Sequence, residues 1–232
     1  MTSRLATTTM EVPGIQRLGP LEFPAMALVR ARRIKRAMDV VFAVIALVVA
    51  APLFMAIALA LVLESGRPIL FRQERVGRGN TRFFILKFRS MVADADAVLA
   101  RYLESDVEAW REWETTRKLR NDPRVTRVGR FLRRTSLDEL PQLWNVLRGE
   151  MSMAGPRPIT ETEIRRYGAA FPFYQLIRPG LTGLWQVSGR NDTTYRRRVE
   201  LDVQYVRRWS PWLDVTLLFR TARVVFVGKG AY

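Results

Sequence analysis

The sequence predicts an α+β protein that is mainly helical and carries a membrane-inserted segment near its N-terminus. Residues 40–63 form a run of 24 residues without a charged side chain, which is long enough to cross a bilayer as a helix. A short region of alternating hydrophobicity follows, and most of the remaining chain has helical periodicity. We therefore expect a flexible tail at residues 1–29, a membrane-inserted unit at residues 30–66 and one compact domain at residues 67–232.

The composition excludes several kinds of active site. None of the 232 residues is Cys or His, which excludes disulfides, cysteine nucleophiles, His-based triads and metal sites that depend on these ligands. A catalytic group must then be Asp, Glu, Ser, Thr, Lys or Tyr, and a metal must be a hard ion such as Mg²⁺. The formal net charge of +16 predicts an acidic partner, which is nucleic acid, anionic lipid or a phosphorylated small molecule.

The tail at residues 1–29 has no sustained apolar period and is rich in turn-forming residues, which predicts mobility. It does not have the pattern of a secretory signal, because the apolar run starts far from Met1.

The apolar run at residues 40–63 has two features that bear on its topology. Pro52 lies close to its centre, where a proline kinks or breaks a helix. Basic residues flank both ends, and such flanks favour the cytoplasmic side of a membrane. They are Arg30, Arg32, Arg33, Lys35 and Arg36 before the run and Arg67, Arg72, Arg75 and Arg78 after it.

A re-entrant helix-break-helix at residues 30–66 satisfies both the proline and the flanks. Two arms of about 12 residues, each about 18 Å long, would enter the bilayer and return on the same side. An ordinary kinked transmembrane helix is the alternative, and the residues alone leave both open.

A small β-hairpin is expected after this unit. Residues 69–73 and 83–88 have strand patterns, and the turn signal Gly77-Arg78-Gly79-Asn80 lies between them. On the second strand Lys87 and Arg89 share one face, and the simplest interpretation is a solvated surface.

Three further helical regions complete the predicted domain. Residues 91–120 are expected to form a pair of surface helices, and residues 193–208 an amphipathic helix. A last helix restarts at Ser210-Pro211 and has large apolar faces. We expect it to lie on anionic lipid, and the alternative is that it closes the soluble core.

Residues 133–158 contain the candidate active site. Asp138 and Glu139 follow Thr135 and Ser136 at an expected helix start, where the positive end of the helix dipole favours carboxylates or bound phosphate. The same spacing also fits a capping box, in which Glu139 only bonds back to the Ser136 amide.

Four ordered motifs then identify a resemblance. They are KFRSM at 87–91, NDPRVTRVGRFLRRTSLDELPQLWNVLRGEMSMAGPRP at 121–158, RPGLTGLWQVSGR at 178–190 and ELDVQYV at 200–206. From about Lys35 to the C-terminus the chain resembles the bacterial sugar transferases known as monotopic polyprenyl-phosphate phosphoglycosyl transferases. It is similar to the compact, exopolysaccharide-initiating type, and it has Ala51 before Pro52 where many relatives have Ser.

The resemblance implies an enzyme at the bacterial inner membrane, with its catalytic domain on the cytoplasmic face. Such an enzyme transfers a sugar-1-phosphate from a UDP-sugar to undecaprenyl phosphate and releases UMP, and glucose or galactose is the expected sugar. Asp138 is implied as the nucleophile, and Glu139 together with Asp138 as the ligands of Mg²⁺. The other implied substrate- or phosphate-binding residues are Lys87, Arg133, Arg157, Arg190 and Asp202.

A non-catalytic alternative is a membrane-tethered basic protein that binds nucleic acid or anionic lipid. The charge supports it, but no nucleic-acid motif is recognisable and the basic residues gather around Asp138 and Glu139. We therefore expect membrane lipid and no nucleic acid as partners, and the sequence leaves the sugar, the pathway and the possibility of an oligomer open.

Overall fold

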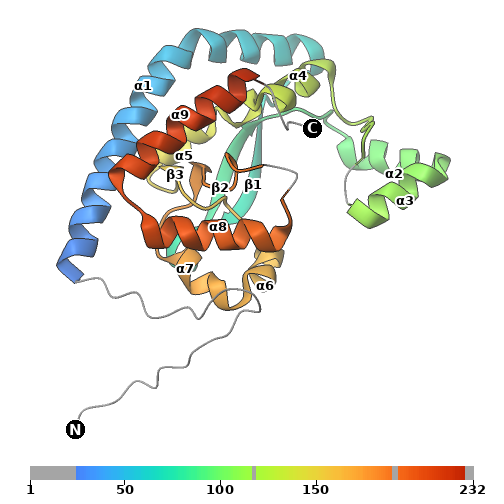
Figure 1. Cartoon of the computed structure of the whole chain (residues 1–232). Coiled ribbons are helices and arrows are strands. Elements are labelled where there is room, and N and C mark those ends of the chain that lie inside the picture. Colours follow the sequence, from blue (N-terminus) through green and yellow to red (C-terminus); the bar gives the residue numbers. More distant parts are fainter. Residues whose placement is uncertain (1–24, 117–118, 190–192, 228–232) are drawn as a thin grey trace.

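A computed structural model describes residues 25–116, 119–189 and 193–227, so most of the predicted tail lies outside the described residues. Figure 1 shows a long bent helix that follows one side and the top of a body made of a hairpin and shorter helices. The protein is mainly helical, as predicted. The elements are α1 (Ala25–Ser65), β1 (Leu70–Val76), β2 (Arg82–Phe88), α2 (Ala95–Ser105), α3 (Val107–Thr116), α4 (Arg127–Thr135), α5 (Gln142–Arg148), β3 (Ser152–Ala154), α6 (Ile164–Tyr167), α7 (Phe171–Gln175), β4 (Gly180–Thr182), α8 (Tyr195–Arg208) and α9 (Pro211–Val227). Short 3₁₀ turns are η1 (Arg78–Asn80), η2 (Leu137–Glu139), η3 (Glu161–Glu163) and η4 (Gly168–Ala170).

Helix α1 contains the apolar run and stays helical through Pro52. It bends in its course over the body (Figure 1), which is the expected effect of an internal proline. Its middle is poorly covered by the protein, since Val48 is 70% exposed. Within the described part of the chain, α1 is the one helix that is long and apolar enough to cross a membrane.

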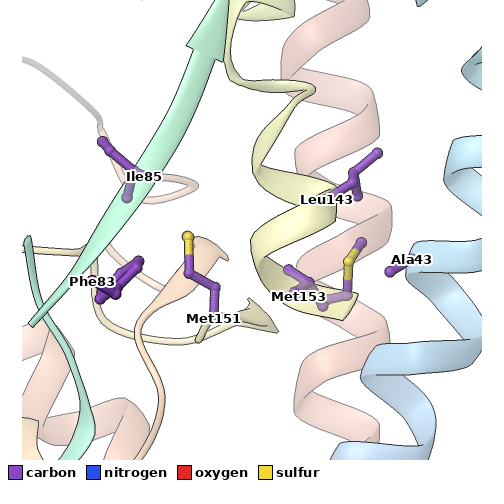
Figure 2. Packing of buried hydrophobic residues seen from close by; sticks show 7 residues of the cluster. Ala43, Phe83, Ile85, Leu143, Met151 and Met153 are labelled. Atoms are coloured by element: carbon purple, nitrogen blue, oxygen red, sulfur yellow. The ribbon is translucent and has the colours of Figure 1, made fainter. Parts of the chain in front are cut away.

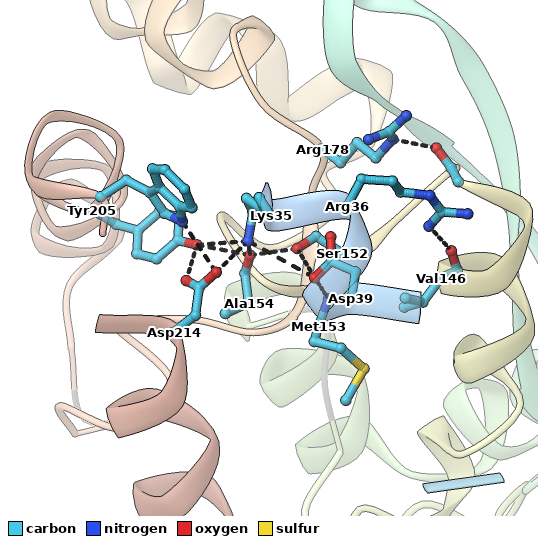
Figure 3. A network of polar contacts seen from close by, with 12 residues as sticks. Lys35, Arg36, Asp39, Val146, Ser152, Met153, Ala154, Arg178, Tyr205 and Asp214 are labelled. Carbon is cyan, nitrogen blue, oxygen red and sulfur yellow. Dashed lines mark hydrogen bonds and ion pairs between the residues drawn. The ribbon is translucent and has the colours of Figure 1, made fainter. Parts of the chain in front are cut away.

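A buried polar network holds the start of α1 against the body (Figure 3). The Lys35 ammonium donates to the Asp214 carboxylate at 2.7 Å, to the Tyr205 hydroxyl at 3.1 Å and to the Ala154 carbonyl at 2.9 Å. One turn later Asp39 accepts from the Ser152 hydroxyl at 2.8 Å. Because each buried charge has partners, this region of α1 has one defined position on β3 and α9.

The end of α1 packs on the same body. Ile57 and Leu61 are buried against Phe88 of β2 and Leu132 of α4. The Arg89 guanidinium donates to the Ser65 and Gly66 carbonyls at 2.6 and 2.9 Å. These bonds satisfy carbonyls that the end of a helix leaves without intrahelical partners.

The predicted hairpin is confirmed, and β1 pairs with β2 in an antiparallel register from Leu70–Phe88 to Val76–Arg82. Its inner face packs on α5 and α1 (Figure 2). Phe83 and Ile85 are buried there, whereas Phe84 on the opposite face is 55% exposed. The interpretation of the Lys87 face as a solvated surface is therefore wrong, because this face of β2 is directed into the protein.

A two-stranded parallel sheet, which the sequence analysis missed, lies beside the hairpin. It pairs Ser152 with Gly180 and Ala154 with Thr182. A Cβ on Gly180 would lie 2.1 Å from the Gly155 nitrogen, so only glycine permits this approach. The pairing sets the segment after β3 next to the segment after β4.

The three helical regions predicted at 91–120, 193–208 and after Ser210 are present as α2 and α3, α8 and α9. The pair α2 and α3 stands away from the body (Figure 1). Helix α8 begins after Thr194, whose side chain accepts a capping bond from the Arg197 amide. Helix α9 closes the core with the fully buried Leu217, but Trp212 and Phe219 on its other sides are 76% and 74% exposed. It therefore closes the core with one face and leaves an apolar surface outside.

Lys35→Ala should destabilise the protein by about 3–5 kcal/mol, because Asp214 would then be a buried carboxylate without its cation. The free energy of unfolding in detergent or nanodiscs measures this effect. Arg101→Ala, which removes a largely exposed arginine of α2, should change stability little. Equal, small losses in both variants would mean that the Lys35 network adds nothing to the docking of α1.

Candidate active site

The two acidic residues lie in η2, a single 3₁₀ turn between α4 and α5. Ser136 has a left-handed conformation (φ 59°) and ends α4, and α5 begins only at Gln142. A helical turn does begin after Ser136, but it is a single 3₁₀ turn and not the start of an α-helix, so the helix-dipole argument built on it does not hold. The capping box is not formed either, because the Ser136 side chain makes no capping bond and the Glu139 carboxylate bonds to a lysine.

That lysine is Lys87, near the end of β2. Its ammonium lies 2.6 Å from Glu139 Oε1 and 3.8 Å from Asp138 Oδ2. On the other side, Arg157 Nη2 lies 3.7 Å from Glu139 Oε1. The structure thus brings together four residues predicted for the site, and they come from three segments far apart in the sequence.

The two carboxylates have different electrostatic surroundings. Burial raises the pKa of Asp138, and the nearby Glu139 raises it further, while Lys87 and Arg133 oppose the shift without reversing it. Burial also acts to raise the pKa of Glu139, but the charges of Lys87 and Arg157 outweigh it and the net shift is downward. Glu139 is therefore the more strongly stabilised anion, and Asp138 is the more basic carboxylate.

Arg133 lies beside Asp138 without a close ion pair to it. Its Nε donates to the Ser90 hydroxyl at 2.8 Å, which fixes the guanidinium. Burial lowers its pKa, and the Asp138 charge opposes that shift. Arg190 lies outside the described residues, and Arg89 is bound to the end of α1 rather than to the site.

Asp202 is buried in α8, close enough to Arg157 for their charges to interact. It accepts a bond of 2.7 Å from the Tyr167 hydroxyl, and its second oxygen, Oδ1, has no hydrogen-bond partner. Burial raises the pKa of Asp202 to about 8, although Tyr167, Arg157 and Arg198 oppose the shift. Its place in the interior favours support of the neighbouring arginines, and direct contact with a substrate stays a prediction.

An aromatic ring links these arginines. The guanidinium carbons of Arg198 and Arg157 lie 4.6 and 6.0 Å from the centre of the Trp185 ring, within the range of cation–π contacts. The sequence analysis assigned no role to Trp185 or Arg198. Trp185 lies in the quoted motif at 178–190, shortly after β4, but the arginine that stacks most closely on it comes from α8, and sequence spacing does not show that contact.

The polar groups converge on a cavity of about 10 Å³. Its lining residues are Lys87, Glu139, Gln142, Arg157, Pro158, Gly180, Leu181 and Gln186. This volume holds about one water molecule, so a larger ligand must bind against the mouth of the cavity.

The donor set suits Mg²⁺ with an anionic substrate. Among the described residues no group of three acidic side chains could hold a metal by itself. Mg²⁺, however, is commonly bound by one or two carboxylates together with substrate phosphates and waters. Asp138 and Glu139 supply such a pair, so the residues present fit the ion.

The chain is similar to several known proteins. Residues 30–228 match the family described as bacterial sugar transferase. The chain is 49% identical over 201 residues to the UDP-galactose-lipid carrier transferase of Erwinia amylovora, an alignment that covers 87% of this chain and 42% of that protein.

Two further relatives differ in how much of their own length the chain covers. The exopolysaccharide production protein ExoY of Sinorhizobium fredii is 47% identical over 198 residues, with 85% of this chain and 88% of that protein covered. The UDP-glucose:undecaprenyl-phosphate glucose-1-phosphate transferase of Escherichia coli is 42% identical over 209 residues, with 87% and 42% covered. The chain therefore spans less than half the length of the Erwinia and Escherichia proteins and most of the length of ExoY.

Asp202→Asn should flatten the pH dependence of stability. Asp202 has a pKa of about 8 in the folded protein and an ordinary value of 3.8, so between these values the folded state holds a proton that the unfolded state has lost. The contribution of Asp202 to stability is complete below pH 4 and is lost as pH rises to 8, by up to about 1.4 kcal/mol per pH unit. Between pH 5 and pH 8 the free energy of unfolding should thus decrease less in Asp202→Asn than in the wild-type protein.

Glu200→Gln is the control, since Glu200 lies on α8 but is partly exposed. An identical slope for wild type and Asp202→Asn would show that Asp202 is already ionised in the folded protein.

Proposed function

The chain belongs to the bacterial sugar transferase family, and we propose that it transfers a sugar-1-phosphate from a UDP-sugar to undecaprenyl phosphate. The products are UMP and undecaprenyl-diphosphate-sugar, which makes this the first membrane step of an exopolysaccharide or another glycoconjugate. The main support from the structure is the carboxylate pair between Lys87 and Arg157. The names of the Erwinia and Escherichia relatives contain galactose and glucose, so these are the sugars we propose.

We propose Asp138 as the nucleophile. A carboxylate oxygen of Asp138 attacks the phosphorus that carries the sugar, the bond to the bridging oxygen breaks, and UMP leaves. A phosphate oxygen of undecaprenyl phosphate then attacks the same phosphorus and displaces Asp138. Glu139 is less suited, because its oxygen is held 2.6 Å from Lys87 and its pKa is lowered, whereas Asp138 lies 3.8 Å from this lysine and is more basic.

The basic residues have the task of neutralising phosphate charge in both steps. Lys87, Arg133 and Arg157 surround the carboxylates, and Arg can bind two phosphate oxygens at once. When bound, Mg²⁺ held by Glu139 and Asp138 supplies further charge neutralisation at the phosphates. The net positive surroundings permit a carboxylate and a diphosphate to approach each other.

We propose that α1 is re-entrant, that it lies in the bacterial inner membrane and that the catalytic domain is on the cytoplasmic face. The support is that Lys35 near the start of α1 and Leu61 near its end pack on the same body. A straight spanning helix would separate these residues by about 39 Å. The basic residues at both ends also favour one side.

The non-catalytic alternative, a basic tether for nucleic acid or lipid, is not favoured. It gives no reason for two half-buried carboxylates among the basic residues of the site, and the relatives are named as transferases. Binding of phosphorylated substrates by a sugar transferase therefore explains the positive charge better than a non-catalytic tether does.

Single cysteines test the topology, because the chain has none of its own. Arg33→Cys and Arg72→Cys, both at exposed positions, should react with an impermeant thiol reagent from the cytoplasmic side only. Val49→Cys in the apolar run is the control and should not react with the reagent added on either side of the membrane. Labelling of the first two positions from opposite sides would show that α1 spans the membrane.

Asp138→Asn should abolish sustained UMP release from UDP-glucose or UDP-galactose in the presence of undecaprenyl phosphate. The amide keeps the shape of the side chain but cannot attack phosphorus, so the phosphosugar adduct on the protein should also disappear by intact-protein mass spectrometry. Glu139→Gln should lose turnover as well. Near-normal turnover in Asp138→Asn would show that Asp138 is not the nucleophile.

Arg157→Ala should lower the rate of UMP release about 100-fold, close to 2.7 kcal/mol, the lower end of the range for one lost phosphate-stabilising donor. The lower end is expected because the Arg157 side chain is 41% exposed. Arg165→Ala is the matched control, since Arg165 is exposed on α6. Equal, small effects of both substitutions would show that Arg157 makes no specific contact with the phosphate and contributes only to the overall positive charge of the surface.

A further inference from the structure

A second group of positive charges lies away from the candidate active site. It surrounds an open groove of about 790 Å³ between the start of α1, the turn of the hairpin and the segment before β4. The lining residues are Arg32, Arg33, Arg36, Ala37, Val40, Val41, Arg78 and Arg178. Five guanidiniums therefore share one groove with an apolar wall.

Three of these arginines are held by backbone carbonyls. Arg36 donates to the Val146 and Leu147 carbonyls at 2.5 and 2.7 Å, and Arg178 donates to the Gly149 carbonyl at 2.5 Å (Figure 3). Arg32 donates to the Leu176 carbonyl at 3.3 Å. A guanidinium has five N–H donors, so these bonds fix the side chains and leave donors for a ligand.

The positive charges of the groove converge and are not neutralised by close ion pairs. A Cβ built on Gly149 would lie 3.5 Å from Arg36 Nη2 and 3.7 Å from Arg178 Nη2, so these two guanidiniums are neighbours. Burial lowers the pKa of Arg178, the charges of Arg78 and Arg36 lower it further, and Asp39 opposes the shift. Among the described residues, the ion pairs include none of the five arginines.

The apolar wall indicates what kind of anion fits. Val40 and Val41 begin the uncharged run of α1, and Val41 is 55% exposed. The arginines thus lie where the basic part of α1 meets its membrane-inserted part, which is the level of lipid headgroups. A ligand with a phosphate and hydrocarbon chains would place its charge among the arginines and its chains along α1.

The groove is separate from the reacting carboxylates. Arg78 lies in the turn of the hairpin, and Lys87 lies near the far end of β2. From Arg82 to Lys87 alone the strand extends about 17 Å. A phosphate in the groove is therefore not the one that receives the sugar phosphate.

We propose that this groove binds the phosphate of an anionic membrane phospholipid and that the bound lipid fixes the start of α1 at the bilayer surface. This inference rests on the proposed membrane insertion of α1, but not on the transfer reaction. Lipid binding and UMP release can therefore be measured separately in the same variants.

The test uses the full chain in detergent, with phosphatidylglycerol or phosphatidylcholine added, and native mass spectrometry counts the lipids that stay bound. The wild-type protein should retain phosphatidylglycerol in preference to phosphatidylcholine. Arg33→Ala/Arg78→Ala should weaken this preference about tenfold or more. Among the described residues, neither arginine has a side-chain bond to another part of the fold, and Arg78→Ala alone should give a smaller loss in the same direction.

The control is Arg101→Ala/Arg111→Ala, which removes the same charge from exposed positions on α2 and α3 and should keep the preference. An equal loss of the preference for phosphatidylglycerol in both double variants would show that only the net charge matters, and it would overturn the proposed lipid site. Displacement of phosphatidylglycerol by an equal amount of undecaprenyl phosphate would overturn the proposed occupant. Normal UMP release by the groove variant, with phosphatidylglycerol binding lost, would support a lipid site independent of catalysis.

Discussion

The burial of the Lys35 ammonium constrains how the long apolar helix α1 and the body of the protein fit together. Lys35 reaches Asp214, Tyr205 and the Ala154 carbonyl in one region, and a buried ammonium is stable only when such partners are in place. The position of α1 is thereby coupled to β3, and β3 leads directly into the segment that carries Arg157. A displacement of α1 would therefore act on the candidate active site in two steps. The first is the contact of Lys35 with Ala154 in β3, and the second is the short segment from β3 to Arg157.

Both anion-binding regions use positive charge, but they hold it differently. Around Asp138 and Glu139 the cations Lys87 and Arg157 form ion pairs with carboxylates, so a phosphate that enters must compete with existing ion pairs. This arrangement suits a transient substrate, because the site remains stable when the substrate leaves. In the groove beside α1 the arginines are held by neutral carbonyls, and the uncompensated charge suits a ligand that stays bound.

The sequence predicted the parts of the fold that depend on local pattern. The apolar run, the hairpin and the helices of residues 195–227 follow from periodicity and turn residues. After Ser136 the chain forms only a 3₁₀ turn, and the capping box is absent because Glu139 contacts Lys87, 52 residues away, and not the Ser136 amide. The parallel pair β3 and β4 was missed because three-residue strands have no readable alternation. The stacking of Arg198 on Trp185 depends on how α8 packs, and spacing does not encode it.

The sequence separation within the Lys35 network has a consequence for biosynthesis. Lys35 and Asp214 are 179 residues apart, and ribosomes add about 5–20 residues per second. For roughly 10–35 s after Lys35 is made, its final carboxylate partner does not yet exist. The apolar part of α1 can enter the bilayer during this interval, while Lys35 stays hydrated at the surface. With the proposed insertion of α1 in this interval, α9 completes the body against a helix that already lies in the membrane, and the Lys35 network closes last.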